Sequence, residues 1–462
     1  MTLIKSISGI RGTIGGRPGD NLTPLDAVKF AAAYGTWLKK QSENNRLKVV
    51  IGRDARLSGK MIQDLVSATL SGLGIDVVDL GLSTTPTVEI AVPMEKADGG
   101  IILTASHNPK QWNALKLLNA KGEFLSGADG KEILEIAESD DYNFAEVDKL
   151  GTVLVHDAYI DIHIDEVLNL DLVEKEKIKE AGFTVVVDGV NSSGGLAVPA
   201  LLKELGVRVI ELYCEPNGEF PHNPEPLKEH LTDIMEKVKE EEADFGIVVD
   251  PDVDRLAFIS ENGEMFGEEY TLVACADYIL SKQKGNTVSN LSSSRALRDV
   301  TVKHGGEYFA AAVGEVNVVT SMKANNAVIG GEGNGGIIYP ESHYGRDALV
   351  GIALFLSLLA ERKVSVSELR ASYPAYFMSK KKIELTPDLD VDAILAGIEK
   401  HYTDEEVTTI DGVKIDFSDS WVHLRKSNTE PIIRIYTEAG AQLAADALAD
   451  RFIEELSALA QK

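Results

Sequence analysis

The chain has 462 residues, 44% of them hydrophobic and 26% charged, with a formal net charge of -27. Because a single core rarely grows beyond about 250 to 300 residues, this length predicts several domains. The acidic balance argues against binding to nucleic acid or to anionic lipid. The sequence contains neither an apolar tract long enough to span a bilayer nor a signal-peptide pattern, so we expect a cytoplasmic protein with no membrane partner.

The first part of the chain alternates between helical and strand patterns. Thr23 is expected to cap an amphipathic helix, and Leu47 to Ile51 is predicted to be a strand. Ser58 is expected to cap a second helix, which the predicted strand Ile75 to Leu80 follows. Alternation of this kind predicts an α/β layer, and we place this first domain at residues 1–152.

The same rhythm restarts after residue 152. Tyr159 to Lys179 has a helical pattern and leads to a predicted strand at Thr184 to Val187. A helix near Leu227 to Glu241 and an apolar strand at Phe245 to Val249 complete the unit. We therefore expect a second α/β domain at residues 153–256.

A hairpin signal opens the next unit. The Asn262-Gly263 pair lies between apolar runs at Leu256 to Ser260 and Glu264 to Phe266, which predicts two strands joined by a tight turn. Alternating helical and strand patterns continue from there. This predicts a third α/β domain at residues 257–373.

The last residues, 374–462, have a different pattern. Three short runs predict strands at Val413 to Phe417, Trp421 to Leu424 and Ile432 to Tyr436, and a closing helix is expected at Ala441 to Ala460. The fold class predicted for the chain is thus α/β, with three successive α/β domains and a C-terminal α+β domain.

Ser106 is displayed on a turn at the end of a predicted buried strand. It lies in the segment Thr104 to Pro109, directly after the apolar run Gly100 to Leu103. A hydroxyl in this place is a candidate phosphoryl carrier. A turn serine that caps the backbone is the plainer alternative, and a Ser-His hydrolase using His107 is a weaker one, because no Gly-x-Ser-x-Gly elbow surrounds the serine.

Three aspartates follow the predicted strand Phe245 to Val249. Asp250, Asp252 and Asp254 are alternate residues, which place their carboxylates on one side of an extended segment, and Arg255 comes next. Such hard oxygen ligands favour magnesium or calcium. An EF-hand is excluded because Arg255 occupies the position that requires glycine. A solvated acidic turn is the remaining alternative.

Two further loops carry groups suited to a phosphorylated ligand. The segment Arg425 to Pro431, with Arg434 beyond it, combines a guanidinium, two hydroxyls and an amide, which together can bind a phosphate. The glycine-rich segment Gly331 to Gly336 lacks the spacing of a nucleotide-binding loop, so Glu332 and Asn334 are better suited to contact hydroxyl groups. Polar hairpin turns are the alternative for both loops.

These four motifs, in this order and spread over the whole chain, resemble those of the α-D-phosphohexomutase superfamily. Further matches are Ser8 to Gly12, Gly52 to Asp54 and Asn113 to Lys116. The resemblance implies three α/β domains with mixed sheets and a C-terminal α+β domain around a central cleft. It also implies an intramolecular phosphotransferase, an isomerase of carbohydrate metabolism.

The resemblance also implies roles for individual residues. Ser106 would carry the phosphoryl group and share a magnesium ion with Asp250, Asp252 and Asp254. The catalytic group would comprise Ser106, His107, Lys116, Arg11 and Arg255. The substrate-binding residues would be Gly314, Glu315, Glu332, Asn334, Arg425, Ser427, Asn428, Thr429 and Arg434. The phosphorylated hexose would be the partner, and the protein would be a monomer or a homodimer.

The sequence departs from the family pattern at one chemically important place. Many members have serine where Asn334 stands and histidine where Gly336 stands, and that histidine is a proposed acid or base. Nearby His343 is a candidate substitute, although a surface loop position would explain it equally well. Asn113 is followed by Ala114, where glycine is more usual.

We therefore expect a magnesium-dependent phosphohexomutase that interconverts hexose 1-phosphate and 6-phosphate through phosphoserine and a hexose 1,6-bisphosphate. The form of the glycine-rich motif resembles archaeal-type phosphoglucosamine mutases and favours glucosamine phosphate as the substrate. A phosphomannomutase or phosphoglucomutase is the near alternative. A metal-dependent sugar phosphatase with Asp250 as nucleophile, and a sugar-phosphate binding protein without turnover, are alternatives of other classes.

Overall fold

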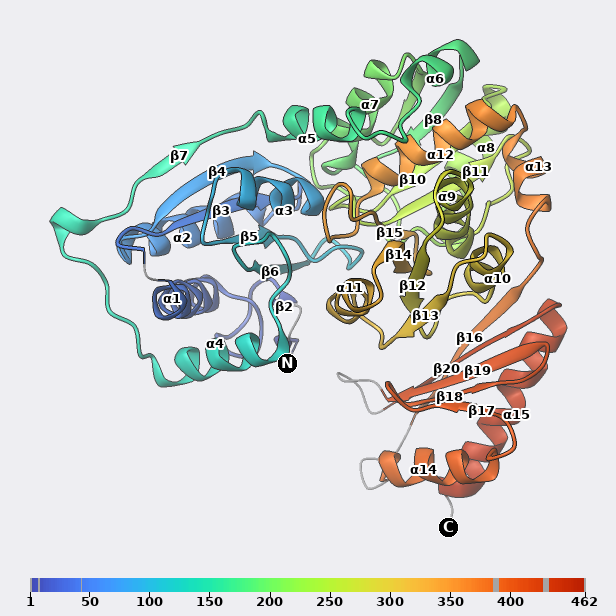
Figure 1. Ribbon diagram of the computed structural model, residues 1–462. Helices are drawn as coiled ribbons and strands as arrows, with labels where there is room; N and C mark the ends of the chain where they lie inside the picture. The colour runs from blue at the N-terminus through green and yellow to red at the C-terminus, as the bar shows by residue number, and fades with distance from the viewer. Residues whose placement is uncertain (1, 7–8, 43, 385–389, 427–431, 461–462) are drawn as a thin grey trace. The chain divides into compact units, whose positions relative to one another are not determined.

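The computed structural model describes residues 2–6, 9–42, 44–384, 390–426 and 432–460. The chain forms two compact units (Figure 1). The first unit comprises Met1–Thr271 and Gly335–Ser367, and the second comprises Leu272–Asn334 and Glu368–Lys462. Each unit is described separately below.

A mixed seven-stranded sheet forms the first part of the first unit. Its strand order is β1-β2-β6-β5-β3-β4-β7, in which β3 runs parallel to β4 and β5, and β6 runs antiparallel to β5 and β2. In chain order the strands are β1 (Ile4–Ser6), β2 (Gly9–Thr13), β3 (Lys48–Arg53), β4 (Asp76–Leu82), β5 (Gly99–Leu103), β6 (Trp112–Leu118) and β7 (Val153–Val155). The helices are α1 (Pro24–Gln41), α2 (Gly59–Gly72), α3 (Thr85–Met94) and α4 (Gly127–Ser139).

Helices cover both faces of this sheet. Val49 and Ile51 of β3 pack in one core with Phe30 of α1 and Val66 of α2. Val50, between them in the strand, packs in another core with α3. Because successive side chains of a strand point to opposite faces, a continuous apolar strand such as β3 requires a helical layer on each side.

The second sheet of the first unit carries the acidic motif. Its order is β11-β10-β8-β9, with β10 parallel to β8 and antiparallel to β11. The strands are β8 (Thr184–Asp188), β9 (Arg208–Leu212), β10 (Phe245–Val249) and β11 (Leu256–Ser260), and the helices are α5 (Tyr159–Leu168), α6 (Lys175–Ala181), α7 (Gly194–Glu204) and α8 (Thr232–Glu240). The short strand β15 (Gly336–Ile338) leads into the apolar helix α12 (Ala348–Arg362), whose Phe355 stacks on Phe258 of β11.

The second unit contains a parallel α/β layer and an antiparallel sheet. Strand β12 (Asn286–Asn290) pairs with β13 (Tyr308–Ala311) and β14 (Ala327–Glu332), both parallel to it. The helices of this layer are α10 (Ala296–Lys303) and α11 (Glu315–Ala324). Helices α9 (Glu268–Lys282) and α13 (Val366–Ala371) begin in the first unit and end in the second.

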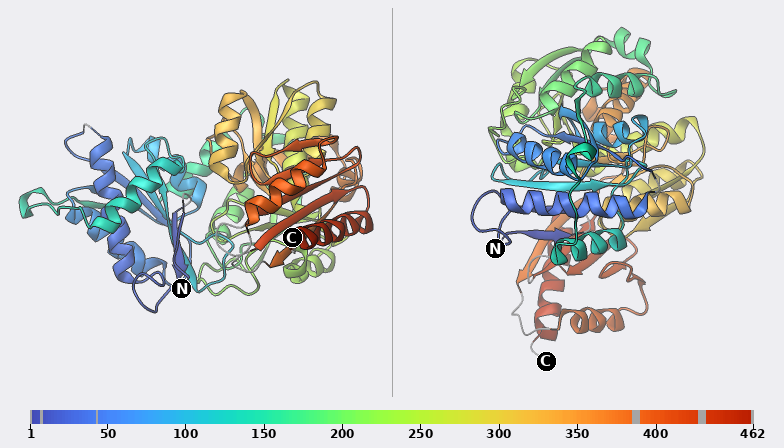
Figure 2. Two further views of the ribbon diagram at one scale, coloured as in Figure 1. Left: turned by 90° about the horizontal axis from the view of Figure 1, so that it is seen from below. Right: turned by 90° about the vertical axis from the view of Figure 1, so that its left-hand side faces the viewer.

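The C-terminal sheet has the order β16-β20-β19-β18-β17 and is antiparallel throughout. Its strands are β16 (Phe377–Glu384), β17 (Glu406–Thr408), β18 (Val413–Asp416), β19 (Ser420–Lys426) and β20 (Ile432–Ala439). Two helices, α14 (Val391–His401) and α15 (Gln442–Ala460), bury their apolar residues against it. The left view of Figure 2 shows the red helix α15 lying along these strands.

The structure confirms the expected fold class of three α/β domains and a C-terminal α+β domain. The domain boundaries at 152, 256 and 373 stay predictions.

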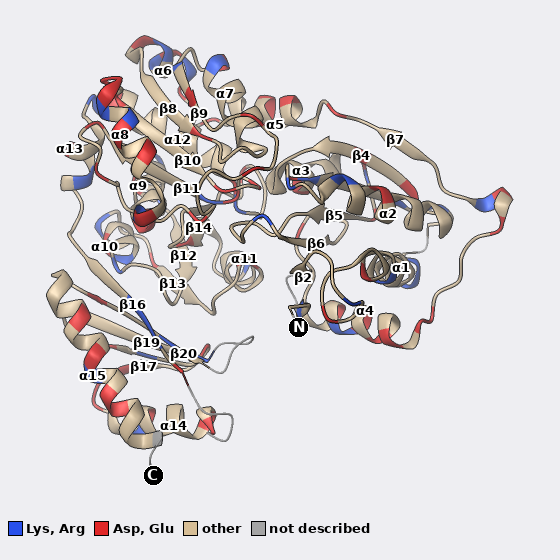
Figure 3. Ribbon diagram, turned by 180° about the vertical axis from the view of Figure 1, so that it is seen from behind, with Lys and Arg blue, Asp and Glu red and all other residues tan. Residues whose placement is uncertain are grey.

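Thr23 caps α1 as expected, because its hydroxyl accepts a hydrogen bond from the Asp26 amide and Asp26 completes a capping box. Acidic residues occur in many elements of both units, for example in α8 and α15 (Figure 3). No helix in the described part of the chain is long and apolar enough to span a membrane.

Three local predictions were wrong, and one helix begins later than expected. The helical stretch at 159–179 is two helices, because Asn169 ends α5, and asparagine side chains favour helix ends over interiors. Ser58 precedes α2 but makes no capping hydrogen bond with its side chain. Its hydroxyl oxygen accepts a hydrogen bond from Asn113 instead.

The expected hairpin partner at Glu264 to Phe266 is a single bridge between Met265 and Ile259 rather than a strand. The turn itself forms, and Gly263 adopts a positive φ of 79°. The chain then enters α9 at Glu268. The helix expected from residue 227 begins at Thr232, after a short 3-10 turn at Lys228–His230.

Candidate active site

Ser106 lies where β5 ends, in a backbone conformation that costs energy for a residue with a side chain. Its φ is 49°, and the residue is only 7% exposed. The amide of Ser106 donates to Thr104 Oγ1 at 2.9 Å, and its hydroxyl donates to Asp250 Oδ2 at 2.7 Å. The hydroxyl is also 3.4 Å from Nδ1 of His107. Strain of this kind at a buried hydroxyl is typical of functional sites.

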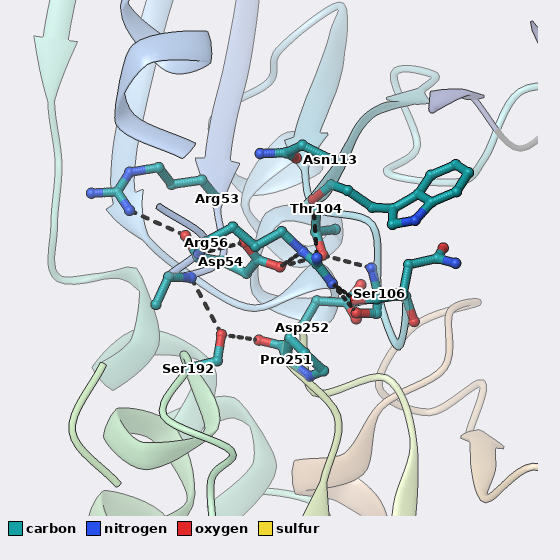
Figure 4. A network of polar contacts seen from close by, with 12 residues as sticks. Arg53, Asp54, Arg56, Thr104, Ser106, Asn113, Ser192, Pro251 and Asp252 are labelled. Atoms are coloured by element: carbon teal, nitrogen blue, oxygen red, sulfur yellow. Dashed lines mark hydrogen bonds and ion pairs between the residues drawn. The ribbon is translucent and has the colours of Figure 1, made fainter. Parts of the chain in front are cut away.

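A buried arginine holds the serine loop in place. Arg56 forms an ion pair with Asp54, with 2.9 Å between Nε and Oδ2, and both side chains are fully buried. Figure 4 shows the guanidinium between Asp54 and the loop of Ser106. It donates to four backbone carbonyls, those of Ser106, Asn108 (2.7 Å), Pro109 (2.8 Å) and Trp112 (3.0 Å). The planar fork of arginine fixes the loop at several points.

Ser192 connects this loop system to the acidic motif. Its hydroxyl accepts from the amide of Ala55 at 3.3 Å and donates to the carbonyl of Pro251 at 2.8 Å (Figure 4). Thr85 makes a second link, because its hydroxyl donates to Asp252 Oδ2 at 2.5 Å. The first and second sheets of the first unit are thus joined next to the serine.

The three aspartates converge as the two-residue spacing predicts. Asp250, Asp252 and Asp254 are fully buried, and one carboxylate oxygen from each lies within 4.8 Å of the others. Oδ1 of Asp252 and Oδ1 of Asp254 are buried and have no hydrogen-bond partner among the described residues. Unpartnered buried oxygens are costly unless a cation binds them, so this donor set fits a magnesium ion.

Cations surround the aspartates. Lys116 Nζ is 2.7 Å from Asp252 Oδ2 and 3.6 Å from Asp254 Oδ2. Arg346, in the loop before α12, donates to Asp254 Oδ2 at 2.6 Å. Arg11 of β2 donates to the serine loop at Asn108 Oδ1, at 3.5 Å.

These charges set the protonation of the site. Burial raises the pKa of Asp250, and the neighbouring charges of Asp252 and Asp254 raise it further. Burial alone would raise the pKa of Asp252, but Lys116 outweighs it and holds that pKa below its usual value. Burial, together with Arg255 and Arg11, lowers the pKa of His107. A neutral imidazole therefore stands beside the serine at neutral pH.

Glu225 faces the catalytic group from the loop between β9 and α8. Its Oε1 is 3.3 Å from Nη1 of Arg255 and 4.0 Å from Nε2 of His107. His343, the candidate substitute for the missing histidine, is half-buried between Glu89 (3.3 Å) and Asp347 (3.2 Å) rather than on the surface.

The first unit therefore brings together every residue expected in the catalytic and metal groups. The sequence did not predict the roles of Arg56, Thr85, Ser192, Glu225 and Arg346. Arg56 lies in the basic turn after β3, and Arg346 lies in the polar segment that also contains His343. A polar turn after an apolar run is a common place for a functional residue. No local pattern, however, distinguishes these two arginines from arginines on the surface.

The second unit holds the residues expected to contact the sugar. Glu332 Oε1 accepts from the amide of Gly314 at 3.1 Å and from Asn290 Nδ2 at 2.8 Å. Glu315 is buried at the first turn of α11, next to Gly314 in the chain, and Asn334 is half-buried. The expected sugar-contacting loop and the glycine-rich loop thus meet at Glu332.

The glycine-rich motif ends beside the acidic motif. Gly335 has a φ of 83°, and a Cβ there would lie 2.1 Å from the carbonyl oxygen of Leu256. The Leu256 amide donates to the Gly335 carbonyl at 3.2 Å. Glycine is required at this position because a side chain would collide with the strand that follows Asp254.

The expected phosphate loop is described only at its margins. Arg425 at the end of β19 pairs across the sheet with Arg434 of β20, and Arg425 Nε is 2.8 Å from Asp411 Oδ2. Ser427, Asn428 and Thr429 lie outside the described residues. Two guanidinium groups at directly paired positions repel each other unless an anion compensates them.

Comparisons with known proteins identify the family of the chain. Four families match along the chain: phosphoglucomutase/phosphomannomutase alpha/beta/alpha domain I at residues 3–144, domain II at 159–263, domain III at 267–376, and the C-terminal domain at 380–455. The chain belongs to the phosphoglucomutase/phosphomannomutase family. It is therefore an enzyme, an isomerase that acts as an intramolecular phosphotransferase.

Several relatives extend over almost the whole chain. A phosphoglucomutase/phosphomannomutase of Thermococcus kodakarensis is 38% identical over 93% of this chain and 94% of its own. A probable phosphoglucosamine mutase of Methanopyrus kandleri is 33% identical over 97% and 96%. The crystal structure of a family member from Burkholderia thailandensis superimposes with a TM-score of 0.85 at 25% identity, covering 99% of this chain and 98% of that chain.

Proposed function

We propose that this enzyme interconverts hexose 1-phosphate and hexose 6-phosphate through phosphorylated Ser106 and a hexose 1,6-bisphosphate, with glucosamine phosphate as the preferred substrate. The observation that carries the proposal is the 2.7 Å hydrogen bond between the hydroxyl of Ser106 and Asp250 in the triad that fits a magnesium ion. A hydroxyl next to a buried cation site is well placed to carry a phosphoryl group, because the cation would offset the charge of the phosphate.

The reaction consists of two phosphoryl transfers in opposite directions. In the first, the bond between phosphorus and Ser106 Oγ breaks, and a bond forms to the free hydroxyl oxygen of the sugar phosphate. The sugar hydroxyl loses its proton and Ser106 Oγ gains one. After the bisphosphate reorients, its other phosphoryl group returns to Ser106 and the isomeric monophosphate remains.

The charge that develops on the transferred phosphoryl oxygens must be compensated. Magnesium bound by Asp250, Asp252 and Asp254 would neutralise part of it. Arg11, Lys116 and Arg255 supply fixed positive charges, and His107, adjacent to Ser106, is placed to exchange the proton with the reacting oxygens.

We infer the substrate contacts from the loops of the second unit. Gly314, Glu315, Glu332 and Asn334 would hold the sugar hydroxyls. Arg425, Ser427, Asn428, Thr429 and Arg434 would hold the phosphate that does not react. Fixing that phosphate separately orients the reacting hydroxyl, and such positioning accounts for a large part of catalysis of phosphoryl transfer.

The environment of Asp250 disfavours the phosphatase alternative. Its Oδ2 accepts from Ser106, while its Oδ1 accepts from the amides of Asp254 and Arg255 at 3.1 Å each. A carboxylate that is engaged at both oxygens is poorly placed to attack a phosphate ester.

The names of relatives support the preferred substrate and also the second candidate. The Methanopyrus kandleri relative is named a probable phosphoglucosamine mutase, and one from Sulfurisphaera tokodaii, 34% identical, a phosphoglucosamine/phosphogalactosamine mutase. The Thermococcus kodakarensis relative, named for glucose and mannose phosphates, keeps those sugars as the second candidate.

Phosphorus NMR of the purified protein tests the proposal. The protein with magnesium is incubated separately with the 1-phosphates of glucosamine, mannose and glucose, each seeded with its bisphosphate. We expect 6-phosphate to accumulate fastest from glucosamine 1-phosphate, and Ser106→Ala to abolish it. Release of inorganic phosphate alone, or retained turnover in Ser106→Ala, would contradict a phosphoserine mutase. Faster conversion of mannose or glucose phosphate would contradict the substrate preference only.

A further inference from the structure

Asp411 contacts both segments of the second unit that are expected to hold the substrate. It lies in the turn between β17 and β18, and its Oδ2 accepts a hydrogen bond from the Val313 amide at 2.9 Å. The same oxygen lies 2.8 Å from Nε of Arg425. Val313 directly precedes Gly314 in the sugar loop, residues 313–315, and Arg425 is the first residue of the expected phosphate loop. One carboxylate oxygen therefore joins the two loops.

The contact with Arg425 is an ion pair rather than a directional hydrogen bond. Nε of Arg425 has no hydrogen-bond partner among the described residues, and the side chains of Arg425 and Asp411 are 24% and 20% exposed. A partly exposed pair of this kind contributes little to stability. The carboxylate also repels any phosphate that approaches the guanidinium. Neither stability nor affinity for phosphate therefore accounts well for Asp411.

The contact with the sugar loop gives a better account. Asp411 accepts from the Val313 amide, and Glu332 Oε1 accepts from the next amide, that of Gly314, at 3.1 Å. Gly314 has a φ of 113°, a conformation that favours glycine. Two consecutive amides are thus held by one carboxylate from the C-terminal sheet and one from β14, and the position of the loop depends on both.

A second connection runs from Asp411 through His423 to the same loop. Nε2 of His423 is 2.6 Å from the Asp411 carbonyl, and Nδ1 is 2.9 Å from the hydroxyl of Ser292. Burial lowers the pKa of His423 to about 4, so the imidazole is neutral at neutral pH. Because a carbonyl can only accept, Nε2 carries the proton and Nδ1 accepts from Ser292. The Ser292 amide donates to Asn290, whose Nδ2 donates to Glu332, and this closes a ring of hydrogen bonds.

The turn that carries Asp411 also lies directly against the strand that carries Arg425. Gly412 has a φ of 71°, and a Cβ there would lie 2.2 Å from the carbonyl oxygen of Leu424. Leu424 precedes Arg425 in the chain and pairs with Val413 across the sheet. The backbone, as well as the ion pair, therefore fixes Asp411 relative to Arg425.

We propose that Asp411 is a positioning residue that fixes the sugar loop relative to Arg425, so that a hexose whose phosphate is bound at Arg425 meets the loop. The inference rests on the proposed function, because it adopts the substrate roles given there to Arg425, Gly314 and Glu332. A ligand that carries both a sugar and a phosphate gains from both sites only if their spacing matches its own. Holding that spacing before the ligand arrives raises the affinity for the whole ligand.

Loss of the carboxylate should affect two ligands differently. Asp411→Ala removes a negative charge next to Arg425, so binding of inorganic phosphate should not weaken. It also releases the Val313 amide, so binding of glucosamine 6-phosphate should weaken by about tenfold. A purely structural role, in which the turn is disrupted and Arg425 is displaced, would weaken the binding of both ligands.

Titrations followed by phosphorus NMR would measure both dissociation constants. The full chain with magnesium would carry Ser106→Ala, so that turnover does not change the ligand. The ratio of the dissociation constant of inorganic phosphate to that of glucosamine 6-phosphate measures the contribution of the sugar. We expect Asp411→Ala to lower this ratio by about tenfold. Asp450→Ala removes the exposed partner of Lys381 in the same domain and should leave the ratio unchanged.

Ser292→Ala tests the other side of the ring. It removes the hydrogen bond to His423 and leaves Asp411 and Arg425 in place, so the ratio should fall by a few-fold with phosphate binding unchanged. Thermal unfolding verifies that each variant is folded. An unchanged ratio in folded Asp411→Ala, or an equal loss of affinity for both ligands, would overturn the proposal. If Asp411→Ala does not fold, an unchanged ratio in Ser292→Ala would do so.

The proposed function fails on a different observation. It fails if the chain without these substitutions does not isomerise a hexose phosphate, whereas the binding titrations require no turnover. The two outcomes are thus distinguishable.

Discussion

The ammonium group of Lys116 lies 2.7 Å from the Oδ2 oxygen of Asp252, in an ion pair that is almost completely buried. Burial alone would lower the pKa of Lys116, but the carboxylates of Asp252 and Asp254 outweigh it and raise that pKa. Lys116 is therefore charged at neutral pH, and its charge lies next to the three aspartates.

Replacing this lysine tests its electrostatic role. We expect Lys116→Gln to lower kcat by about a hundredfold or more, because a fixed positive charge next to the transferring group is lost. Turnover would be measured with the preferred sugar phosphate at saturating magnesium. Lys110→Gln, in an exposed pair with Glu219, is the matched control and should keep its activity. A loss of only a few-fold in Lys116→Gln would show that this charge is dispensable.

We expect Arg56 to act by holding the serine loop in place rather than by contacting the substrate. Arg56→Lys removes most of the donors to the loop carbonyls and leaves them buried, so we expect a loss of about 3 kcal/mol in the free energy of unfolding. We also expect a smaller fraction of the variant to be phosphorylated at Ser106, which intact mass spectrometry would measure. Arg46→Lys, in an exposed pair with Asp76, serves as control with little change in stability. Unchanged stability in Arg56→Lys would contradict the role assigned to it.

Removal of the cation tests the acidic motif. We expect chelation to abolish turnover and added magnesium to restore it, because three buried carboxylates in close proximity need a counter-charge. Asp254→Asn should weaken magnesium binding measured by calorimetry by about tenfold or more, while Asp244→Asn, outside the motif, should not. Full activity after thorough chelation would exclude a metal-dependent transfer.

His343 should make stability depend on pH in the alkaline range. Burial lowers its pKa, but the carboxylates of Asp347 and Glu89 outweigh this and raise the pKa to about 10. The unfolded value is about 6.5. Its contribution to the free energy of unfolding is thus complete below pH 6.5 and is lost as the pH rises toward 10.

Denaturant unfolding of wild type and His343→Gln at several pH values would measure this effect. The difference in unfolding free energy should be largest near pH 6 and should shrink as the pH approaches 10. His401→Gln, at an exposed position, should show no such trend. A difference that stays constant over this range would mean that His343 contributes packing rather than charge.

Much of the fold could be predicted from local patterns. Thr23 and Asp26 form the expected capping box, and the apolar runs before Ser106 and Asp250 are the buried strands β5 and β10. Where prediction failed, a local preference was weaker than a tertiary contact: the Ser58 hydroxyl accepts from Asn113 instead of capping α2.

The sequence by itself determined which residues end buried strands, and therefore where a displayed hydroxyl and a set of convergent carboxylates occur, because strand periodicity and turn chemistry act over a few residues. Only the tertiary structure decided that Ser106 meets Asp250, 144 positions away, and that Arg346 meets Asp254, 92 positions away. Such contacts depend on how sheets and helices pack. No local pattern distinguishes an arginine that will be buried at the site, such as Arg56 or Arg346, from one that will remain on the surface.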